Sequence, residues 1–506
     1  MLNHDQVLCE YVRRGHIGWR AAIDLVQGVL FKNSNKLYHL DLEFSILEDE
    51  TDFPQGSSLT NAEILQAFLK NQPTPDFVRI CWNDLTASPR MRMVPFRKFA
   101  SLLSEGQSTD IGITKAVFGM LQNDCLMPNV SPTGEYRLHP DFSSLKKGPI
   151  EGHISMHGDF REQSGARVPL CPRSVLQQAV EYGAQNGLSF LLGFEIEFLL
   201  VERVETKPGN TTRYTTLTTD GHAWSVSRYF ANPRIATLLR DMVSALDEMG
   251  IYVEQLHAES ATGQFELILP PYPPLQSVDT LLHTRDVMSA LATAAGFKIT
   301  LHPKPFTAAC GTASHMHMSI IKPASGPPAG PAIYNPFYAG ILTHLRAILA
   351  FTYSNPASYE RSSDGTWSGG RWVTWGTQNR ETALRKIEGS HWELKCMDGL
   401  ANPYFAVAAV LFSGIRGVVD GEALVWGDCE IDPAKLTAND RRELGVSQML
   451  PGSVEEALTA LKGDAALVEM MGPELVERYV AVKEFELAFL GEMGEEERRQ
   501  WLMERY

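Results

Sequence analysis

Three glutamates within one strand–turn–strand pattern constrain this chain more than any other feature of its sequence. Residues 250–271 read GIYVEQLHAESATGQFELILPP, and the small residues at 261–263 separate two extended runs. Glu254, Glu259 and Glu266 therefore belong to one predicted hairpin. Carboxylates crowded at strand ends repel one another unless a cation lies between them, and Mg²⁺ or Mn²⁺ is the usual cation. A solvent-facing hairpin with surface acids is the alternative interpretation.

A second acidic pattern lies upstream, inside an apolar run. Residues 190–201 read FLLGFEIEFLLV, and Glu195 and Glu197 are the only charged residues in it. Two residues apart on a strand, both side chains point to the same face. Like charges on a buried face are costly without a counter-ion, so the pair favours another part of a cation site. A pair on the solvent face of a sheet is the alternative.

Two histidines form a third pattern downstream. Residues 308–320 read AACGTASHMHMSI, in which His315 and His317 alternate with methionines and share one strand face with Ser319. A single histidine on such a face is usually a hydrogen-bonded core residue. Two of them, after a glycine-containing turn and two acidic strands, favour metal ligands or phosphate contacts.

Composition narrows the class of protein. The net charge of −15 over 506 residues argues against general binding to nucleic acids or acidic membranes. The seven cysteines are scattered without a CxxC pair, which indicates a reducing compartment and no cysteine-type zinc site. The first residues show no secretory signal, and no run of about 18 apolar residues occurs. We therefore expect a cytoplasmic protein that binds neither nucleic acid nor membrane.

The chain is long enough for more than one domain. Residues 1–73 have apolar spacing typical of helices and predict a helical N-terminal extension. Residues 74–150 predict a small α+β domain with strands at 77–83 and 90–95. From residue 151 onward helices and strands alternate without simple βαβ order. This pattern favours a large mixed or antiparallel sheet covered by helices, in a catalytic domain over 151–506.

Arginines cluster between the histidine strand and a further acidic residue. Residues 375–385 read WGTQNRETALR, and both Arg380 and Arg385 could hold a phosphate through paired donors. Surface arginines in water are the alternative. Glu393, in the ELK sequence before DGLANPYF, would complete the acidic set. No GxxxxGK[ST] or GxGxxG loop occurs, so a nucleotide would be held by metals and arginines instead.

Taken in order along the chain, these motifs resemble glutamine synthetase. The matching stretches cover about residues 74–490 and are GFEIEF, HAESATGQFE, HPKPF with HMHMS, SYER, NRETALR, and ExK with DxxANPYF. The sequence is similar in particular to the glutamine-synthetase-like ligases of fungi. The resemblance implies an α+β fold with a β-grasp-like small domain and a large catalytic domain, whose curved, mainly antiparallel sheet is flanked by helices. It also implies a homo-oligomeric ring with active sites between subunits.

The resemblance further implies a ligase that uses ATP and two or more Mg²⁺ or Mn²⁺ ions. The side-chain carboxylate of glutamate would become an acyl phosphate, from which an amine displaces phosphate. Dications would neutralise the crowded phosphates and align the γ-phosphate for transfer. The positions matching the family's metal ligands form two sets: Glu197, Glu259 and Glu266 for one ion, and Glu195, His315 and Glu393 for the other.

Other functional positions of the family are matched residue by residue. The resemblance assigns nucleotide contacts to His317 and Ser319, phosphate contacts to Arg380 and Arg385, a substrate-carboxylate contact to Arg361, and the glutamate-holding loop to Gly311. Arg361 and Arg380 are thereby the catalytic candidates.

The departures from the family pattern concern both substrates. The family's DGSS-type motif, whose Asp helps bind ammonium, is absent, and residues 106–115 offer only Asp110 nearby. Trp367 stands where the family has a flap Glu, and an aromatic residue there would favour a larger amine. Cys310 replaces an Asn beside the glutamate loop, and Lys395 replaces an Arg.

We therefore expect an ATP- and Mg²⁺-dependent ligase that joins a carboxylate, γ-glutamyl in the first instance, to an amine larger than ammonia. Both substrates are small molecules. Three alternatives stay open: an authentic glutamine synthetase served by Asp110 or another acid, a non-catalytic regulator on the same fold, and a metal-dependent hydrolase that would not need Arg380 and Arg385.

Overall fold

The structure is a computed structural model that describes residues 59–70, 72–204, 213–216, 222–230, 232–307, 309–321 and 329–506. Most of the predicted helical extension lies outside these residues. Its described part forms α4, Asn61–Leu69, as the sequence predicts. Thr60 and Glu63 cap this helix reciprocally, which satisfies backbone donors at its start. Two compact units are present, and α4 belongs to the smaller one, while Pro73–Ile320 and Pro328–Tyr506 form the larger.

The first sheet of the larger unit belongs to the predicted small domain. Its strands run in the order β2-β1-β6-β4-β3, with β5 beside β6, and β1 pairs in parallel with β6. The last strand, β6, lies beyond residue 150, where the sequence pattern ends the small domain. The elements are β1 Phe77–Asn83, β2 Pro89–Pro95, α5 Phe96–Ser104, β3 Ile111–Thr114, η2 Lys115–Gly119, β4 Glu135–Pro140, η3 Phe142–Ser144, β5 Lys146–Lys147 and β6 His153–Arg161.

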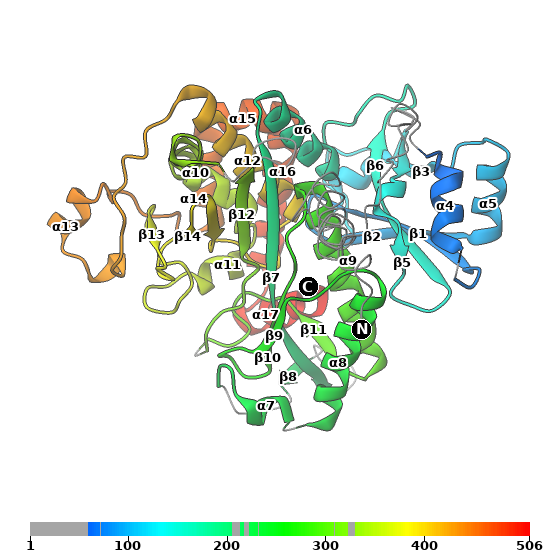
Figure 1. Cartoon of the computed structure of the whole chain (residues 1–506), viewed down its shortest axis with the longest axis horizontal. Coiled ribbons are helices and arrows are strands. Elements are labelled where there is room, and N and C mark those ends of the chain that lie inside the picture. Colours follow the sequence, from blue (N-terminus) through cyan, green and yellow to red (C-terminus); the bar gives the residue numbers. More distant parts are fainter. Residues whose placement is uncertain are drawn as a thin grey trace, which may run out of the picture. The chain divides into compact units, whose positions relative to one another are not determined.

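The second sheet carries the acidic and histidine patterns. Its strands run in the order β13-β14-β15-β12-β7-β10-β9, with β11 and β8 also pairing with β7 (Figure 1). The described pairs are mainly antiparallel, as predicted, and β13 with β14 is parallel. The strands are β7 Ser189–Val204, β8 Arg213–Thr216, β9 Gln255–Ala258, β10 Gln264–Ile268, β11 Lys298–Thr300, β12 Met316–Ile321, β13 Trp375–Thr377, β14 Leu384–Glu388 and β15 His391–Leu394.

Strand β7 organises the second sheet because its two faces differ. Phe194, Ile196 and Phe198 are buried on one face, whereas Glu195 and Glu197 point to the other. Neighbouring strands lie on both sides of β7, so its backbone donors and acceptors are paired with protein. A central position for this apolar run is what the sequence predicts.

Helices surround the second sheet, and many begin with proline at a first-turn position, where its missing N–H costs no hydrogen bond. They are α6 Pro172–Gln185, α7 Val226–Phe230, α8 Pro233–Glu248, α9 Pro274–Ala294, α10 Pro331–Thr352, α11 Pro356–Arg361, α12 Pro403–Asp420, η4 Pro433–Lys435, α13 Ala438–Glu443, α14 Val454–Gly463, α15 Ala465–Met471, α16 Pro473–Gly491 and α17 Glu495–Arg505. Within the described residues, α12 alone has the length and apolar character to cross a membrane, yet 78% of it is buried. It packs against α10 and α6, so its composition is that of a central core helix.

A buried arginine connects the small-domain region to the helices that pack on the second sheet. Arg173, in the first turn of α6, forms ion pairs with Asp141 at 2.5 Å, Asp159 at 2.9 Å and Asp279 at 2.8 Å. Asp141 and Asp159 belong to the small-domain region, and Asp279 lies on α9. The hydroxyl of Tyr404, on α12, also donates to Asp279 at 2.6 Å. This closed network positions the small sheet against the helices behind the large one.

Candidate active site

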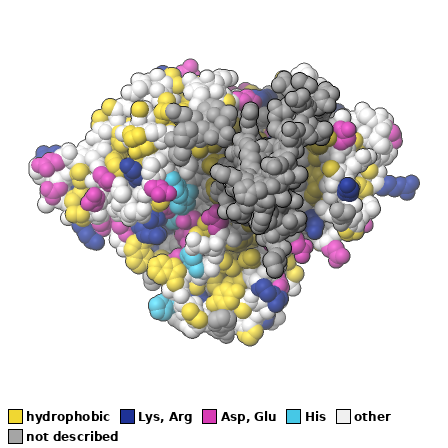
Figure 2. All heavy atoms as spheres, in the orientation of Figure 1, with side chains coloured by type: hydrophobic (Ala, Val, Ile, Leu, Met, Phe, Trp, Pro, Cys, Tyr) yellow, Lys and Arg dark blue, Asp and Glu magenta, His cyan; other side chains and the backbone are white. Residues whose placement is uncertain are grey.

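Strand pairing brings the predicted carboxylates and histidines together on the second sheet. β10 pairs with β7 so that Glu266 lies directly opposite Glu197. On the other side of β7, the backbone N–H of Glu195 donates to the carbonyl oxygen of His315 at 3.1 Å. Figure 2 shows histidine, acidic and basic side chains close together near the middle of one face of the molecule. Residues far apart in sequence thus form one polar region.

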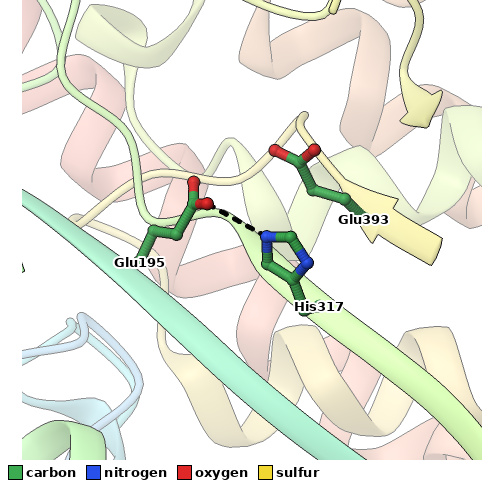
Figure 3. A group of neighbouring side chains, drawn as sticks. All are labelled: Glu195, His317 and Glu393. Atoms are coloured by element: carbon green, nitrogen blue, oxygen red, sulfur yellow. Dashed lines mark hydrogen bonds and ion pairs between the residues drawn. The ribbon is translucent and has the colours of Figure 1, made fainter. Parts of the chain in front are cut away.

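One group of potential ligands comprises Glu195, His317 and Glu393, from β7, β12 and β15 (Figure 3). Their ligand atoms all lie within 4.8 Å of one another. His317 Nε2 is 3.0 Å from Glu195 Oε1. His315, predicted for the same ion, directly precedes β12, and its Nδ1 lies 2.7 Å from Glu195 Oε2 and 3.4 Å from Glu393 Oε1. Both histidines therefore flank the predicted site.

Glu195, Glu393 and the neighbouring His315 are in the protonation states that bind metals, whereas burial lowers the pKa of His317 and its hydrogen bond with Glu195 outweighs burial and raises it. Burial raises the pKa of Glu195, but hydrogen bonds with His315 and His317 outweigh it and hold this pKa well below its ordinary value. Against the effect of burial, the charges of Lys395 and His315 lower the pKa of Glu393 to about 2. Burial and the charge of Lys395 lower the pKa of His315 to about 4, so its imidazole is neutral at pH 7. Ionised carboxylates and neutral imidazoles are the forms that bind metals.

A second group comprises His257, Glu259 and Glu266, from the predicted hairpin. His257 Nε2 lies 3.4 Å from Glu266 Oε2, and its Nδ1 lies 3.7 Å from Glu259 Oε1. Glu197, predicted for the same ion, is held beside this group. Its Oε2 accepts hydrogen bonds from Gln264 Nε2 at 2.8 Å and from the backbone N–H of residue 313 at 3.0 Å.

The second group contains more negative charge than the protein neutralises. Burial and repulsion from Glu195, Glu197 and Glu259 raise the pKa of Glu266 to about 11. Burial raises the pKa of Glu197 to about 7, against the opposing charge of Arg361. These carboxylates can all ionise only if a cation lies between them.

The buried Nδ1 of His257 also has no hydrogen-bond partner within the described chain. Carboxylate oxygens with a few imidazole nitrogens are a donor set that Mg²⁺ and Mn²⁺ accept. The crowded acids and the unpaired nitrogen therefore fit the predicted pair of divalent cations.

Cationic side chains border the first group. Arg361 Nη2 and Lys395 Nζ lie 3.2 and 3.4 Å from His315 Nε2, and both side chains are buried. Lys395 Nζ is also 3.2 Å from Glu393 Oε1, and Arg385 Nη1 is 3.1 Å from Glu393 Oε2. Positive charge thus stands directly beside the potential metal ligands, where an acid substrate or a phosphate would need it.

The loop before β12 approaches these cations closely. The carbonyl oxygen of Gly311 accepts a hydrogen bond from Gln264 Nε2 at 3.0 Å. A Cβ atom at Gly311 would lie 2.4 Å from Cγ of Arg361, so no other residue fits without moving that side chain. Cys310 Sγ lies 3.6 Å from Ser260 Oγ. The predicted substrate loop therefore lies against Arg361 and the hairpin turn.

Two predicted nucleotide or phosphate residues stand apart from both groups. Arg380 is exposed in the turn between β13 and β14, and it forms no ion pair with any described residue. Ser319 lies on β12, two positions beyond His317, and is half-buried. Their roles stay predictions, since the groups above are formed without them.

Neither of the two residues tied to amine choice belongs to the two groups of potential metal ligands. Trp367 occupies a left-handed conformation with φ of 56°, and its ring is 59% exposed. Its backbone N–H donates to Glu381 Oε1 at 2.9 Å, which anchors this loop. Asp110, next to β3, pairs with His139 of β4 at 2.6 Å. The carboxylate of Asp110 is therefore engaged within the small sheet.

Three residues of the polar region were missed by sequence reasoning, and they share one signal. Each stands two residues before a predicted glutamate, and therefore on the same strand face. They are His257, Gln264 and His391. His391 Nε2 lies 2.9 Å from His317 Nδ1. The period of two that revealed Glu195 with Glu197 could have found all three.

Comparison with known sequences identifies relatives. The family profile described as "Glutamine synthetase, catalytic domain" matches residues 169–506. The chain is 36% identical over 505 residues to Protein fluG of Emericella nidulans, a match that covers 99% of this chain. It spans 57% of the length of fluG. It is also 29% identical over 441 residues to Gamma-glutamylpolyamine synthetase GlnA3 of Streptomyces coelicolor, covering 82% of this chain and 89% of that protein.

Solved structures show the same fold. The structure titled "GmaS/ADP complex-Conformation 1" matches with a TM-score of 0.72 at 22% identity, over 87% of this chain and 99% of that one. "Crystal structure of novel glutamine synthase homolog" matches with a TM-score of 0.70 at 26% identity, over 86% and 99% of the two chains. The predicted α+β fold, with its curved, mainly antiparallel sheet flanked by helices, is confirmed.

Proposed function

This chain belongs to the glutamine synthetase family, and we propose that it is an ATP-dependent ligase acting on an amine larger than ammonia. In this reaction the γ-phosphoryl group of ATP passes to a carboxylate oxygen of the acid, most simply the γ-carboxylate of glutamate. The amine nitrogen then attacks the carbonyl carbon, loses a proton and releases phosphate. The products are an amide, ADP and phosphate.

One observation carries the proposal: two groups of potential metal ligands lie beside a buried pair of cations. Arg361 and Lys395 both approach His315 Nε2, and both are buried. A buried cation is costly unless an anion joins it, and Glu393 neutralises only part of this charge. An acid substrate held here would present its reacting carboxylate next to the two groups. A simple hydrolase would not need such a pair.

The donor set assigns the metals to the two groups already described. Glu195, His315, His317 and Glu393 would hold one ion, and Glu197, Glu259 and Glu266 with His257 would hold the other. When bound, Mg²⁺ or Mn²⁺ would neutralise phosphate charge during transfer. Gln264 orients Glu197, and Arg385 orients Glu393.

The choice of a larger amine is supported by what replaces the family's ammonium pocket. Asp110 is paired with His139, and Trp367 offers an exposed ring instead of a carboxylate. An aromatic face attracts an alkylammonium group more effectively than it attracts small hydrated ammonium. The similarity to Gamma-glutamylpolyamine synthetase GlnA3 supports the same class of amine.

The test is phosphate release from ATP with Mg²⁺ or Mn²⁺, with glutamate as the acid. Ammonium would be compared with monoamines, diamines and longer polyamines, and products would be identified by mass. Turnover with an alkyl amine and little with ammonium is the expected result. Turnover with ammonium alone would identify an authentic glutamine synthetase, and absence of turnover with glutamate and every amine would count against the proposed ligase.

We also propose a cytoplasmic homo-oligomeric ring whose active sites lie between subunits. The support is the family and the reducing composition of the chain. Light scattering coupled to gel filtration would measure the mass directly. A monomer that turns over substrate would contradict the shared active site.

A further inference from the structure

The face of β7 that turns away from the carboxylates borders a cavity of about 190 Å³. Its floor is Ile196, which lies between Glu195 and Glu197 in sequence and points to the opposite face. Other walls come from α9, β11, the turn between β1 and β2, and the end of α17. The cavity therefore lies within a single chain, behind the candidate active site.

Most of the wall is apolar. The side chains that supply this surface are Ile196, Leu282, Met288, Ile299 and Leu301. Pro89 and Ser289 are exposed at the rim, which gives the cavity a side open to solvent. An engineered apolar cavity of about 150 Å³ holds a benzene molecule, so the volume here suits one ring with a small substituent.

One polar group in the wall has a hydrogen bond to give. Arg285, on α9, donates from Nη2 to Ser314 Oγ at 2.9 Å and from Nη1 to the carbonyl of Gly399 at 3.4 Å. Its buried Nε has no hydrogen-bond partner, and no carboxylate of the described chain forms an ion pair with it. A guanidinium with a buried, unpaired Nε and only neutral hydrogen-bond partners is an incomplete arrangement.

The remaining charges around the cavity favour an anion. Arg505 also lines it, and its Nε donates to the carbonyl of Gln122 at 3.1 Å. The one acidic side chain in the wall, Asp286, is already paired with Arg79 at 2.6 Å. Burial lowers the pKa of Arg285 to about 10, and the charge of Asp398 opposes this only in part. A ligand carboxylate would supply the missing counter-charge.

We propose that this cavity is a second binding site, for a small organic anion with an apolar body, such as an aromatic carboxylate. The carboxylate would accept from Arg285, and the apolar body would lie between α9 and the back face of β7. This proposal goes beyond the ligase reaction and does not depend on it.

The position of the site gives it a route to the metal ligands. Ser314, which receives the hydrogen bond from Arg285, directly precedes His315 and is fully buried. Ile196 stands between two of the carboxylates on the same strand. An anion that draws Arg285 toward itself would weaken or shift its bond to Ser314. We therefore expect occupancy of the cavity to change divalent-cation affinity, and the coupling to be reciprocal.

The direct test is calorimetric titration of the full chain with benzoate and, separately, with benzamide, its neutral counterpart of similar shape. Saturable binding of about one benzoate per chain, at least tenfold tighter than benzamide, is the expected result. Arg285→Gln keeps donors for Ser314 and should lose at least tenfold in benzoate affinity. Arg240→Gln, at an exposed arginine paired with Asp241, is the matched control and should bind benzoate normally.

A second variant separates the cavity from the charge. Leu282→Trp should fill the space and abolish binding while Arg285 is retained, with thermal melting used to confirm that each variant folds. No benzoate binding by the wild-type chain would overturn the site. Equal binding of benzoate and benzamide, or unchanged binding in Arg285→Gln, would overturn the anion assignment. Equal Mn²⁺ affinity with and without saturating benzoate would overturn the coupling.

Discussion

Two clusters of carboxylates in this chain differ in whether the protein supplies their counter-charge: one surrounds Arg173 and the other surrounds Glu266. Around Arg173, three aspartates share a resident guanidinium. That guanidinium outweighs burial and lowers the pKa of Asp141 and of Asp279, whereas burial outweighs it at Asp159 and raises that pKa. Around Glu266, neighbouring glutamates add to the effect of burial and raise its pKa to about 11. The Arg173 cluster contains its own counter-charge, whereas the glutamate cluster around Glu266 becomes stable in its ionised form only when cations bind to it.

The contrast separates structural charge from functional charge. A cluster that carries its own counter-ion can fasten elements together without a ligand, as Arg173 does between α6, α9 and the small sheet. A cluster that lacks one stores repulsion that a substrate or metal can relieve. Arg285 is the cationic counterpart of the second kind, since its Nε is buried and no carboxylate among the described residues forms an ion pair with it.

The largest effect on stability is expected at the Arg173 cluster. Arg173→Met leaves three carboxylates without their counter-ion and should lower the free energy of unfolding by about 3–5 kcal/mol. Urea unfolding measures the loss. Arg416→Met, which breaks the exposed pair with Asp420, should hardly change the free energy of unfolding. Similar losses in the two variants would mean that the Arg173 network is not structural.

At the glutamate cluster around Glu266, Glu259→Ala should reduce phosphate release by at least about a hundredfold, because the substitution removes a metal ligand that no neighbour replaces. The free energy of unfolding should hardly change, since Glu259 is only half-buried and its charge helps to raise the pKa of Glu266 in the metal-free protein. Glu254→Ala, in the same hairpin, is the matched control and should retain activity. Full activity in Glu259→Ala would remove this residue from the metal site.

A buried base with no acidic partner gives a third case. Burial, with the charges of Arg499 and Arg498, lowers the pKa of His302 to about 3, from about 6.5 in an unfolded chain. Between these values the unfolded chain binds the extra proton, so stability falls as pH decreases from about 6.5 toward 3. At pH 5 the protonation of His302 in the unfolded chain should lower the free energy of unfolding by about 2 kcal/mol.

Urea unfolding of His302→Gln at pH 7 and pH 5 tests this. The variant should lose less stability on acidification than the wild type does. His222→Gln, at an exposed histidine, should match the wild type. An identical pH dependence in all three proteins would show that His302 does not enter folding as a neutral side chain.

A smaller effect is expected from Glu266→Gln, which removes one charge while nearly keeping its shape. Mn²⁺ affinity should fall by about tenfold to a hundredfold. In EDTA the variant should melt at the same temperature as the wild type or slightly higher, because burial and the neighbouring glutamates raise the pKa of Glu266, and a neutral Gln avoids the cost of protonating that carboxyl on folding. A clear fall in melting temperature in EDTA would contradict the repulsion on which the comparison rests.

The smallest effect concerns the amine, outside both clusters. Trp367→Glu should raise the use of ammonium relative to alkyl amines several-fold, because it exchanges an aromatic face for a carboxylate. Product ratios in mixed-amine reactions measure the change. Trp224→Glu, at another exposed tryptophan, serves as the control. An unchanged ratio in Trp367→Glu would remove this residue from amine selection.

Local sequence patterns predicted several helices and strands, but they could not predict which distant strands pair with each other. The alternation at Phe77–Asn83 and the capped helix Asn61–Leu69 occur as the sequence indicates, because period and caps act within a few residues. The first strand of the predicted hairpin spans only Gln255–Ala258, so Glu254 and Glu259 lie just outside it. The sequence could not predict that β6 joins the small sheet, because the two strands of a parallel pair are far apart in sequence.

The candidate site was predictable where two residues on one strand face carry the same chemistry. Glu195 with Glu197, and His315 with His317, were found in this way. Position on a strand says nothing of distance across the fold, so the exposed place of Arg380 and the pairing of Asp110 with His139 needed the structure. The cavity beside Arg285 is assembled from six separate segments and leaves no sequence pattern.

The central claim is that the glutamate cluster, unlike the Arg173 cluster, is completed by divalent cations. Electron paramagnetic resonance of Mn²⁺ titrated into the metal-free chain counts bound ions directly. The account predicts two or more Mn²⁺ per chain for the wild type and fewer for Glu259→Ala. An absence of bound Mn²⁺, or the same number in both proteins, would contradict it.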